Sequence, residues 1–249
     1  MSGHSKWHSI KHKKGAADKA RGKLFAVLIR QIEVAARAGG GDPEGNATLR
    51  TMIQKARDNS VPADTITRAI KRGTGEEEGV TYEQVSYEGY AAHGVAVYVQ
   101  ALTDNRNRTG AEIRNLFTRN GGSFAEPGAV SWQFERKGIV VVDRAADEDE
   151  LTLAAAEGGA EDVVREGSGF EVVSAPDDLQ AVREALDAAG ISYESADLTM
   201  LPKTTVAVED ESAAKKLLRL VDALEENDDV QDVYANFDIP ERVLELVAG

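Results

Sequence analysis

The sequence has 249 residues and no cysteine, and its 43 Asp and Glu residues outnumber its 29 Lys and Arg residues, for a formal net charge of −14. The lack of cysteine excludes disulfides, thiolate metal sites and cysteine nucleophiles, and no apolar run approaches the ~20 residues that span a bilayer. The acidic balance of the whole chain argues against nucleic-acid binding. However, residues 1–75 contain 15 Lys and Arg against 6 Asp and Glu, whereas residues 76–249 contain 14 against 37. The average charge therefore describes neither part.

The first residues form a polar, basic arm without the apolar segment of a secretory signal, so we expect a cytoplasmic protein. Cations attract phosphates and an indole can stack on an unpaired base, which favours a nucleic-acid-binding arm over a merely solvated terminus. The arm residues predicted to contact nucleic acid are Lys6, Trp7, Lys11, Lys13, Lys14, Lys19, Arg21 and Lys23. His4, His8 and His12 would share one face of a helix, but this stretch lacks helix-forming strength and a nearby acid. We therefore predict no metal and no cofactor.

Hydrophobic periodicity predicts three helices, at about residues 16–38, 46–59 and 61–73. On the first helix, Lys19, Lys23, Arg30 and Arg37 fall on one face, opposite a stripe formed by Leu24, Leu28 and Ile32. This basic face predicts a second set of phosphate contacts. The alternative is an ordinary solvated helix face.

The third predicted helix presents further cations, namely Arg68, Lys71 and Arg72. Since the second and third helices are separated by about two residues, they could form a helix-turn-helix whose third helix enters a major groove. A short helical hairpin with a purely structural role is the alternative. No residue here fixes base recognition.

After a predicted linker at residues 74–79, the pattern changes to strands and helices. We expect a strand hairpin at 82–88 and 94–102 and a helix at 109–120 that opens with a capping box of Thr109 and Glu112. A strand containing Val130, Trp132 and Phe134 follows.

Residues 137–200 read as an acidic β-α-β-β-α-β module, the order of the ferredoxin-like fold. Its strands are predicted at 139–143, 161–166, 170–174 and 192–199, with helices at 147–156 and 177–189. The tail adds strands at 204–208 and 230–237 around a helix at 212–225. We therefore predict an α+β fold: a basic arm and three-helix domain (1–78), a discontinuous α/β domain (79–136 plus 201–249), and a ferredoxin-like domain (137–200) inserted into it.

The loop TDNRNRT, residues 103–109, lies between a predicted strand and a helix N-terminus. Unpaired helix N–H groups together with Arg106 and Arg108 suit a phosphate or carboxylate. Alternatively, Asp104 pairs with one of these arginines and the asparagines build the turn.

An enzyme is not indicated, because the sequence lacks a P-loop, a dinucleotide-binding glycine motif, HExxH and GxSxG. His93 lies in a predicted hairpin turn without a nucleophile placed beside it by a motif. We therefore expect no catalytic residue and no small-molecule substrate.

Five segments together resemble the YebC/PmpR family, which includes the mitochondrial translational activator of cytochrome c oxidase. They are GHSKWHSIKHKK, RGKLFAVLIRQIEVAARAGGGDPEGNATLR, RAIKRGTG, TDNRNRTGAEIR and DDVQDVYANFD. The resemblance implies a helical N-terminal domain followed by two α/β domains, the last inserted into the other, and no catalytic chemistry. It also implies that the residues matching the N-terminal signature meet nucleic acid, namely Lys6, Trp7, Lys11, Lys13, Lys14, Arg21 and Lys23.

We therefore expect a non-enzymatic regulator of gene expression that binds DNA and regulates transcription. The first alternative is a ribosome-associated translation factor that binds ribosomal RNA. The second is a protein-interaction scaffold whose basic tail docks on an acidic partner or on the protein's own body. No membrane partner is expected.

Overall fold

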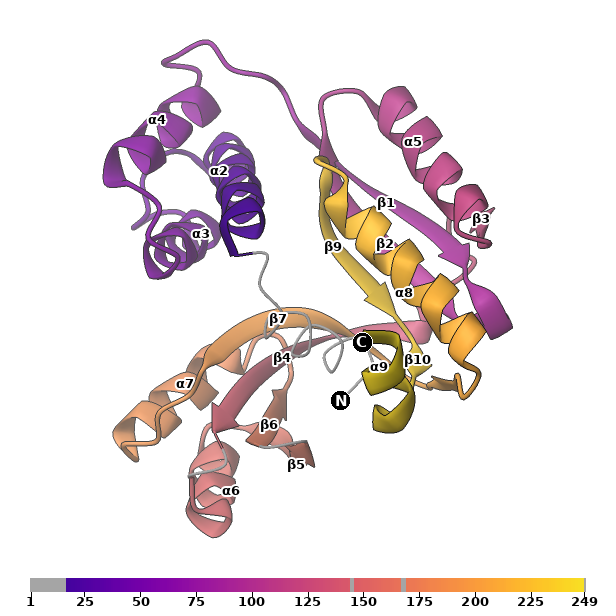
Figure 1. The fold of residues 1–249 in the computed structure, drawn as a ribbon. Helices are drawn as coiled ribbons and strands as arrows, with labels where there is room; N and C mark the ends of the chain where they lie inside the picture. Colours follow the sequence, from indigo (N-terminus) through magenta and orange to yellow (C-terminus); the bar gives the residue numbers. More distant parts are fainter. Residues whose placement is uncertain (1–16, 144–145, 167–168, 249) are drawn as a thin grey trace. The chain divides into compact units, whose positions relative to one another are not determined.

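A computed structural model describes residues 17–143, 146–166 and 169–248 (Figure 1). Its described residues divide into two compact units. The first contains residues 131–207 and 234–238, and the second contains residues up to 130 together with 208–233 and 239–248. Helices and sheets of both units give the α+β class that the sequence predicts.

The N-terminal part of the second unit is helical. It contains α2 (Ala17–Gly39), α3 (Ala47–Asp58) and α4 (Ala63–Thr74), close to the predicted ranges. Leu28, Ile32, Leu49, Ile53 and Ile66 belong to its buried core. In contrast, Leu24, which the helical stripe placed in this core, is 36% exposed.

One side chain fixes the turn from α2 into α3. The amide of Asn46 donates to the carbonyl oxygens of Ala35 and Gly40 at 2.8 and 2.9 Å. Its carbonyl oxygen accepts from the backbone N–H of Leu49 at 3.1 Å, which caps α3. Because Asn46 is buried, these bonds satisfy polar groups that would otherwise be costly.

Close packing joins α4 to α2. At Gly73, an added Cβ would lie 2.5 Å from the carbonyl oxygen of Glu33 and 2.7 Å from the Cβ of Ala36. Only glycine allows the two backbones to approach this closely. The glycine that ends the predicted third helix is therefore a packing residue.

The sheet of the second unit has the order β3-β1-β2-β9. It comprises β1 (Glu83–Tyr90), β2 (Ala96–Thr103), β3 (Ser123–Ala125) and the C-terminal strand β9 (Val230–Ala235). Helices α5 (Arg106–Arg119) and α8 (Glu211–Glu226) contact each other along this sheet, and α9 (Glu241–Ala248) packs on α8 (Figure 1). The sheet thus combines strands from both sides of the 137–200 segment.

The first unit contains β4 (Phe134–Asp143), α6 (Glu148–Glu157), β5 (Ala160–Glu166), β6 (Gly169–Ser174), α7 (Leu179–Ala188) and β7 (Ser195–Pro202). The strand order is β5-β6-β4-β7, and the pairings are antiparallel. This is the ferredoxin-like arrangement that the β-α-β-β-α-β order predicts. Short strands β8 (Val206–Ala207) and β10 (Phe237–Asp238) pair separately, in parallel.

Several local predictions are wrong. Helix α5 begins three residues before Thr109, with Asn105 as its N-cap, so Thr109 and Glu112 form no capping box. The segment Ser131–Gln133 is a 3-10 turn, and Trp132 is 66% exposed instead of alternating in a strand. Strand β3 and helix α9 were not predicted. The three domain boundaries given above stay a prediction.

Candidate nucleic-acid interface

The predicted arm lies largely outside the described residues. Lys6, Trp7, Lys11, Lys13 and Lys14 fall there, as do His4, His8 and His12. Lys19 and Arg21 lie on α2, but their side chains are not described. The part of the interface that the structure describes therefore starts at Lys23. The nucleic-acid contacts predicted for the arm residues before Lys23 stay a prediction.

Two cations of the α2 stripe bind the loop that precedes β9. The amine of Lys23 donates to the carbonyl oxygen of Asn227 at 2.7 Å. The guanidinium of Arg30 donates to the carbonyl oxygen of Asp228 at 2.5 Å and to the carboxylate of Asp229 at 3.3 Å. Burial lowers the pKa of the Lys23 amine, although Asp228, Glu225 and Glu226 raise it. These contacts compete with phosphate for Lys23 and Arg30.

The last cation of the stripe, Arg37, remains exposed in the final turn of α2. It makes one long hydrogen bond, 3.4 Å, to the carbonyl oxygen of Val80. Such a contact at the surface contributes little to stability, so a phosphate can replace it.

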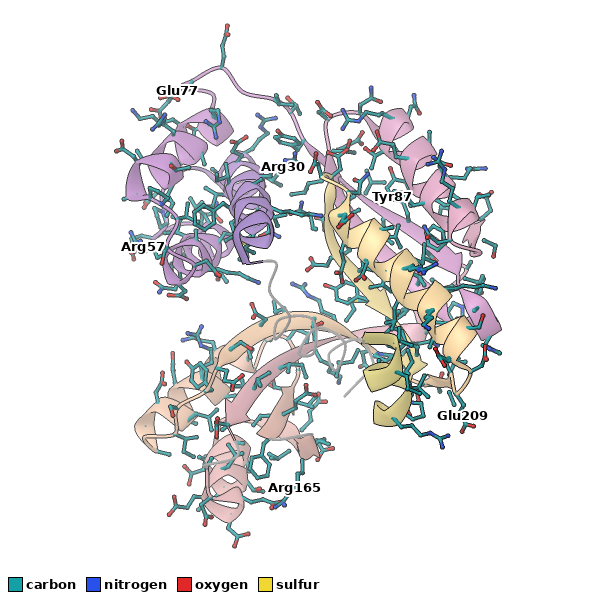
Figure 2. The ribbon with its side chains drawn as sticks, in the orientation of Figure 1. Arg30, Arg57, Glu77, Tyr87, Arg165 and Glu209 are labelled. Atoms are coloured by element: carbon teal, nitrogen blue, oxygen red, sulfur yellow. The ribbon has the colours of Figure 1, made fainter. Side chains whose placement is uncertain are left out.

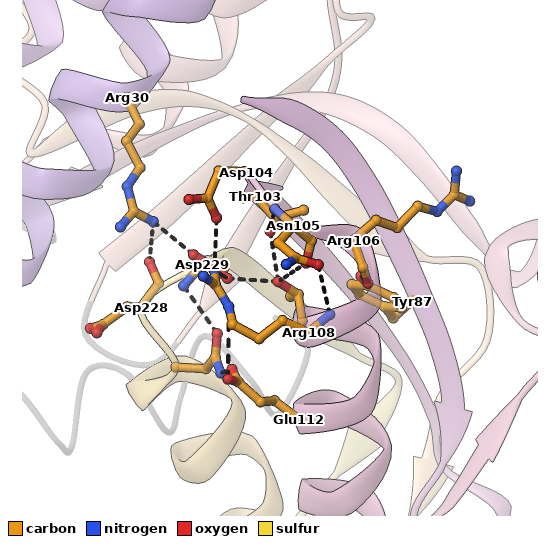
Figure 3. Close-up of polar contacts among 12 residues, drawn as sticks. Arg30, Tyr87, Thr103, Asp104, Asn105, Arg106, Arg108, Glu112, Asp228 and Asp229 are labelled. Carbon is orange, nitrogen blue, oxygen red and sulfur yellow. Dashed lines mark hydrogen bonds and ion pairs between the residues drawn. The ribbon is translucent and has the colours of Figure 1, made fainter. Parts of the chain in front are cut away.

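The carboxylate of Asp229 is the centre of a polar network (Figure 3). Asp229 is 5% exposed and accepts hydrogen bonds from Arg108 at 2.5 Å and from the hydroxyl of Thr109 at 2.6 Å. The Thr109 hydroxyl lies 2.7 Å from that of Thr103, and both residues are fully buried. Burial raises the pKa of the Asp229 carboxyl, but the bonds from Thr109 and Arg108 and the charges of Arg108 and Arg30 outweigh it, so the pKa lies below its ordinary value.

Arg108 is committed to this network. Besides Asp229, it pairs with Asp104 at 3.0 Å and approaches Glu112 at 3.8 Å. The hydrogen bond and charge of Asp229 raise the pKa of the Arg108 guanidinium. Asp104 therefore pairs with Arg108, which is the alternative given from the sequence for an arginine of this loop.

Arg106 has a different position. Its side chain points away from Asp229, on the side of Tyr87 (Figure 3). Its carbonyl oxygen accepts the Tyr87 hydroxyl at 3.3 Å, while its side chain is exposed. Among the described residues, no ion pair involves the Arg106 guanidinium. The two arginines of the loop thus face different surroundings, which their spacing in the sequence did not indicate.

The cations of α4 also divide. Arg72 donates through Nε to the buried carboxylate of Glu33 at 2.7 Å, and its Nη2 forms a second bond to the same oxygen. It therefore holds α4 against α2. Lys71 is exposed, and Arg68 makes only a 3.9 Å pair with the exposed Asp64 one turn earlier. Arg68 and Lys71 thus form the accessible cationic face of α4.

Sequence reasoning missed Asp229 and Arg114. Asp229 stands in an acidic run, DD, with nothing local to show that one carboxylate is buried. Arg114 lies on α5 with its guanidinium carbon 4.7 Å from the centre of the Phe124 ring. Arg114 follows Arg106 by eight residues, and this spacing is visible in the sequence. Because the helix was predicted to begin at Thr109, Arg106 was not placed on the same helix as Arg114.

In the part of the chain that the structure describes, no group of three or more His, Cys, Asp or Glu side chains is arranged to hold a metal. His93 lies in a 3-10 turn (Ala92–Gly94) with a positive φ of 59°, and its side chain is exposed. No described helix is both long and apolar enough to cross a membrane.

Two family models together match almost the whole chain. The TACO1/YebC protein N-terminal domain matches residues 5–76, and the TACO1/YebC second and third domain matches residues 82–237. The chain belongs to the TACO1/YebC family. The two models meet at the segment between α4 and β1, where the net charge changes sign.

Relatives in the TACO1/YebC family cover the full length. A probable transcriptional regulatory protein of Thermobifida fusca is 57% identical over 250 residues, which is 100% of both chains. One of Halothermothrix orenii is 56% identical over 250 residues, 99% of both. A crystal structure of a conserved hypothetical protein from Aquifex aeolicus matches with a TM-score of 0.81 at 49% identity, over 90% of this chain and 93% of the other.

Proposed function

We propose that this TACO1/YebC protein is a non-enzymatic, DNA-binding regulator of transcription. The observation that carries the proposal is the opposite charge of its two parts: 15 Lys and Arg against 6 acids in residues 1–75, and 14 against 37 in the remainder. The names of the relatives, probable transcriptional regulatory proteins, support it. The protein would act in the cytoplasm, with nucleic acid as its partner and without a cofactor, small-molecule substrate or membrane.

The basic part would bind phosphates through two kinds of residue. The arm, Lys19 and Arg21 supply cations by composition alone. On the described surface, Arg37, Arg68 and Lys71 are the exposed cations of the predicted set in this part. Lys23, Arg30 and Arg72 would act mainly by holding the helices and the loop before β9 in place. The acidic remainder would repel phosphates, so that one face engages nucleic acid.

Salt-dependent binding to duplex DNA tests this function. We expect affinity to fall steeply as salt rises, because each neutralised phosphate releases counterions. The double variant Arg68→Gln/Lys71→Gln should lower the slope of log K against log salt by about 2. Lys216→Gln, at an exposed position of α8, is the matched control and should leave the slope unchanged. A slope near zero for the unmodified protein would rule the function out.

Ribosome binding is the second candidate. Trp7 among the lysines of the arm, and the aromatic groove on α5 described below, suit unpaired RNA at least as well as a duplex. Co-sedimentation of the protein with ribosomes would favour this function. Binding confined to particular promoter fragments in the presence of excess competitor DNA would favour transcription. If the protein showed no affinity for nucleic acid, the protein-interaction scaffold would be the favoured function.

A further inference from the structure

A groove runs between α5 and the strands β1 and β3, within the second unit. Its volume is about 620 Å³, and its lining includes Arg106, Asn107, Arg114 and Asn115 from α5, with Tyr87 of β1 and Phe124 of β3. Figure 2 shows Tyr87 on the sheet beside α5. Among the residues that the structure describes, no carboxylate lines this groove. The groove therefore presents cationic and amide side chains above an aromatic floor formed by Tyr87 and Phe124. This part of the chain is acidic on average.

Aromatic packing holds the floor in place. The rings of Tyr87 and Phe124 lie 6.1 Å apart at 49°, and Phe117 meets Phe124 edge-on at 6.1 Å and 82°. Phe117 is fully buried, so it anchors this cluster to the core. Tyr87 is 8% exposed and the Arg114 guanidinium lies over Phe124, so these rings form a fixed base of the groove and not an open stacking surface. A fixed base lowers the entropic cost of binding a ligand above it.

The two groove arginines are placed for a polyanion. Arg106 and Arg114 lie eight residues apart on α5, which is about 12 Å along the helix. The Arg114 guanidinium stacks over Phe124 with 4.7 Å from its central carbon to the ring centre. A stacked guanidinium presents its outer face to a base and its edge N–H groups to a phosphate. The two asparagine amides can both donate to and accept from base edges.

The only acid of α5 is kept away from the groove. Glu112 accepts from the Asn227 amide at 2.9 Å and lies near Arg108, on the Asp229 side of the helix. The network around Asp229 thus gathers the carboxylates on one side of α5. On the groove side, no carboxylate of the described residues forms an ion pair with Arg106 or Arg114.

Gly110 leaves the groove open without a packing reason. A Cβ at this position would meet the Tyr87 ring at 3.5 Å and its hydroxyl at 3.7 Å, which is ordinary van der Waals contact. Glycine inside a helix costs roughly 1 kcal/mol relative to alanine. Neither a clash nor a positive φ requires glycine here, and a large side chain at this position would enter the groove.

We propose that the α5 groove binds single-stranded nucleic acid, with phosphates held by Arg106 and Arg114 and a base stacked against the Arg114–Phe124 pair. This inference rests on the proposed nucleic-acid-binding function and assigns it a second surface outside the basic N-terminal part. Bases in a duplex are paired and stacked on one another, so their faces cannot stack on the Arg114–Phe124 pair. The groove therefore selects unpaired segments.

The test is fluorescence anisotropy of the full chain with a labelled single-stranded 12-mer RNA and with the corresponding duplex. Arg114→Gln removes the stacked cation, and Gly110→Leu fills the groove without changing charge. Arg119→Gln is the matched control, because it removes the same charge from an exposed position on the same helix outside the groove. Thermal unfolding of each variant checks that it folds, and Gly110→Ala is a smaller replacement if Gly110→Leu does not.

We expect both groove variants to weaken single-strand binding about tenfold, as loss of one base–aromatic stack would. Arg119→Gln should weaken it less than about threefold, and Gly110→Leu should leave duplex binding within twofold. Free AMP in millimolar excess should not displace the strand, and displacement at micromolar AMP would instead assign the groove to a free nucleotide.

Equal single-strand affinities of the groove variants and Arg119→Gln would overturn the groove site while leaving the proposed function intact. If the unmodified protein bound neither the single strand nor the duplex at low salt, the proposed function and the groove would both be wrong.

Discussion

At the scale of single residues, the structure divides the predicted phosphate ligands into two groups. Arg72 and Arg108 hold buried carboxylates of Glu33 and Asp229, whereas Arg68 and Arg106 remain exposed. The sequence showed Arg68 and Arg72 only as cations near other cations, and it left open whether Arg106 or Arg108 pairs with Asp104. Which carboxylate becomes buried depends on tertiary packing, and local pattern carries no signal for that. The candidate site could therefore be predicted by composition but not by residue.

Asp229→Asn should lower the free energy of unfolding by about 2 kcal/mol, because the buried carboxylate bonds both Thr109 and the charged Arg108. Asp228→Asn is the matched control. Its side chain is exposed and only its backbone oxygen accepts from Arg30, so it should change stability by less than about 0.5 kcal/mol. Urea unfolding of both variants measures the difference, and equal losses would show that Asp229 is not the centre of the network.

The same carboxylate predicts a pH dependence. Because the folded state holds the pKa of Asp229 below its ordinary value of 3.8, the stability from this group is fully present above that value. It is lost as pH falls through the lower pKa of the folded state. The stability difference between the unmodified protein and Asp229→Asn should thus shrink below about pH 4. A difference that stays constant down to pH 2 would contradict the direction of the shift.

At the scale of elements, the hydrophobic period predicted the helices and most strands, because burial of one face fixes the element type. Boundaries failed where a polar side chain, not the period, decides them. Asn105 caps α5 through the N–H of Arg108, so Thr109 falls inside the helix and turns its hydroxyl to Asp229. The short strand β3 and the terminal helix α9 lack a period long enough to detect.

Two glycines on helices should respond oppositely to alanine. Gly73→Ala should destabilise the protein by about 1–3 kcal/mol, since its Cβ would meet the Glu33 carbonyl oxygen at 2.5 Å and overpacking exceeds the gain in helix propensity. Gly110→Ala, in open contact with Tyr87, should stabilise it by roughly 0.5–1 kcal/mol. Thermal or urea unfolding of both distinguishes them. A stabilising Gly73→Ala would mean that α2 and α4 do not pack this closely.

At the scale of the whole molecule, the net charge of −14 is the sum of two opposite parts. The β-α-β-β-α-β order was sufficient to predict the ferredoxin-like sheet β5-β6-β4-β7, because few sheet topologies accept that order. Charge along the chain predicts that residues 1–75 meet nucleic acid, and this stays a prediction. It did not predict the groove on α5, because α5 lies within the acidic remainder and its cations separate from its acid only in three dimensions.

Ultraviolet crosslinking of the full protein to nucleic acid in cells, with mapping of the crosslinked peptides, tests the central proposal most directly. The proposal predicts recovery of nucleic acid on peptides from residues 1–75 and from α5, and identification of the recovered strand as DNA or RNA decides between transcription and the ribosome. Crosslinks confined to the acidic residues 137–200, or no recovered nucleic acid, would contradict it.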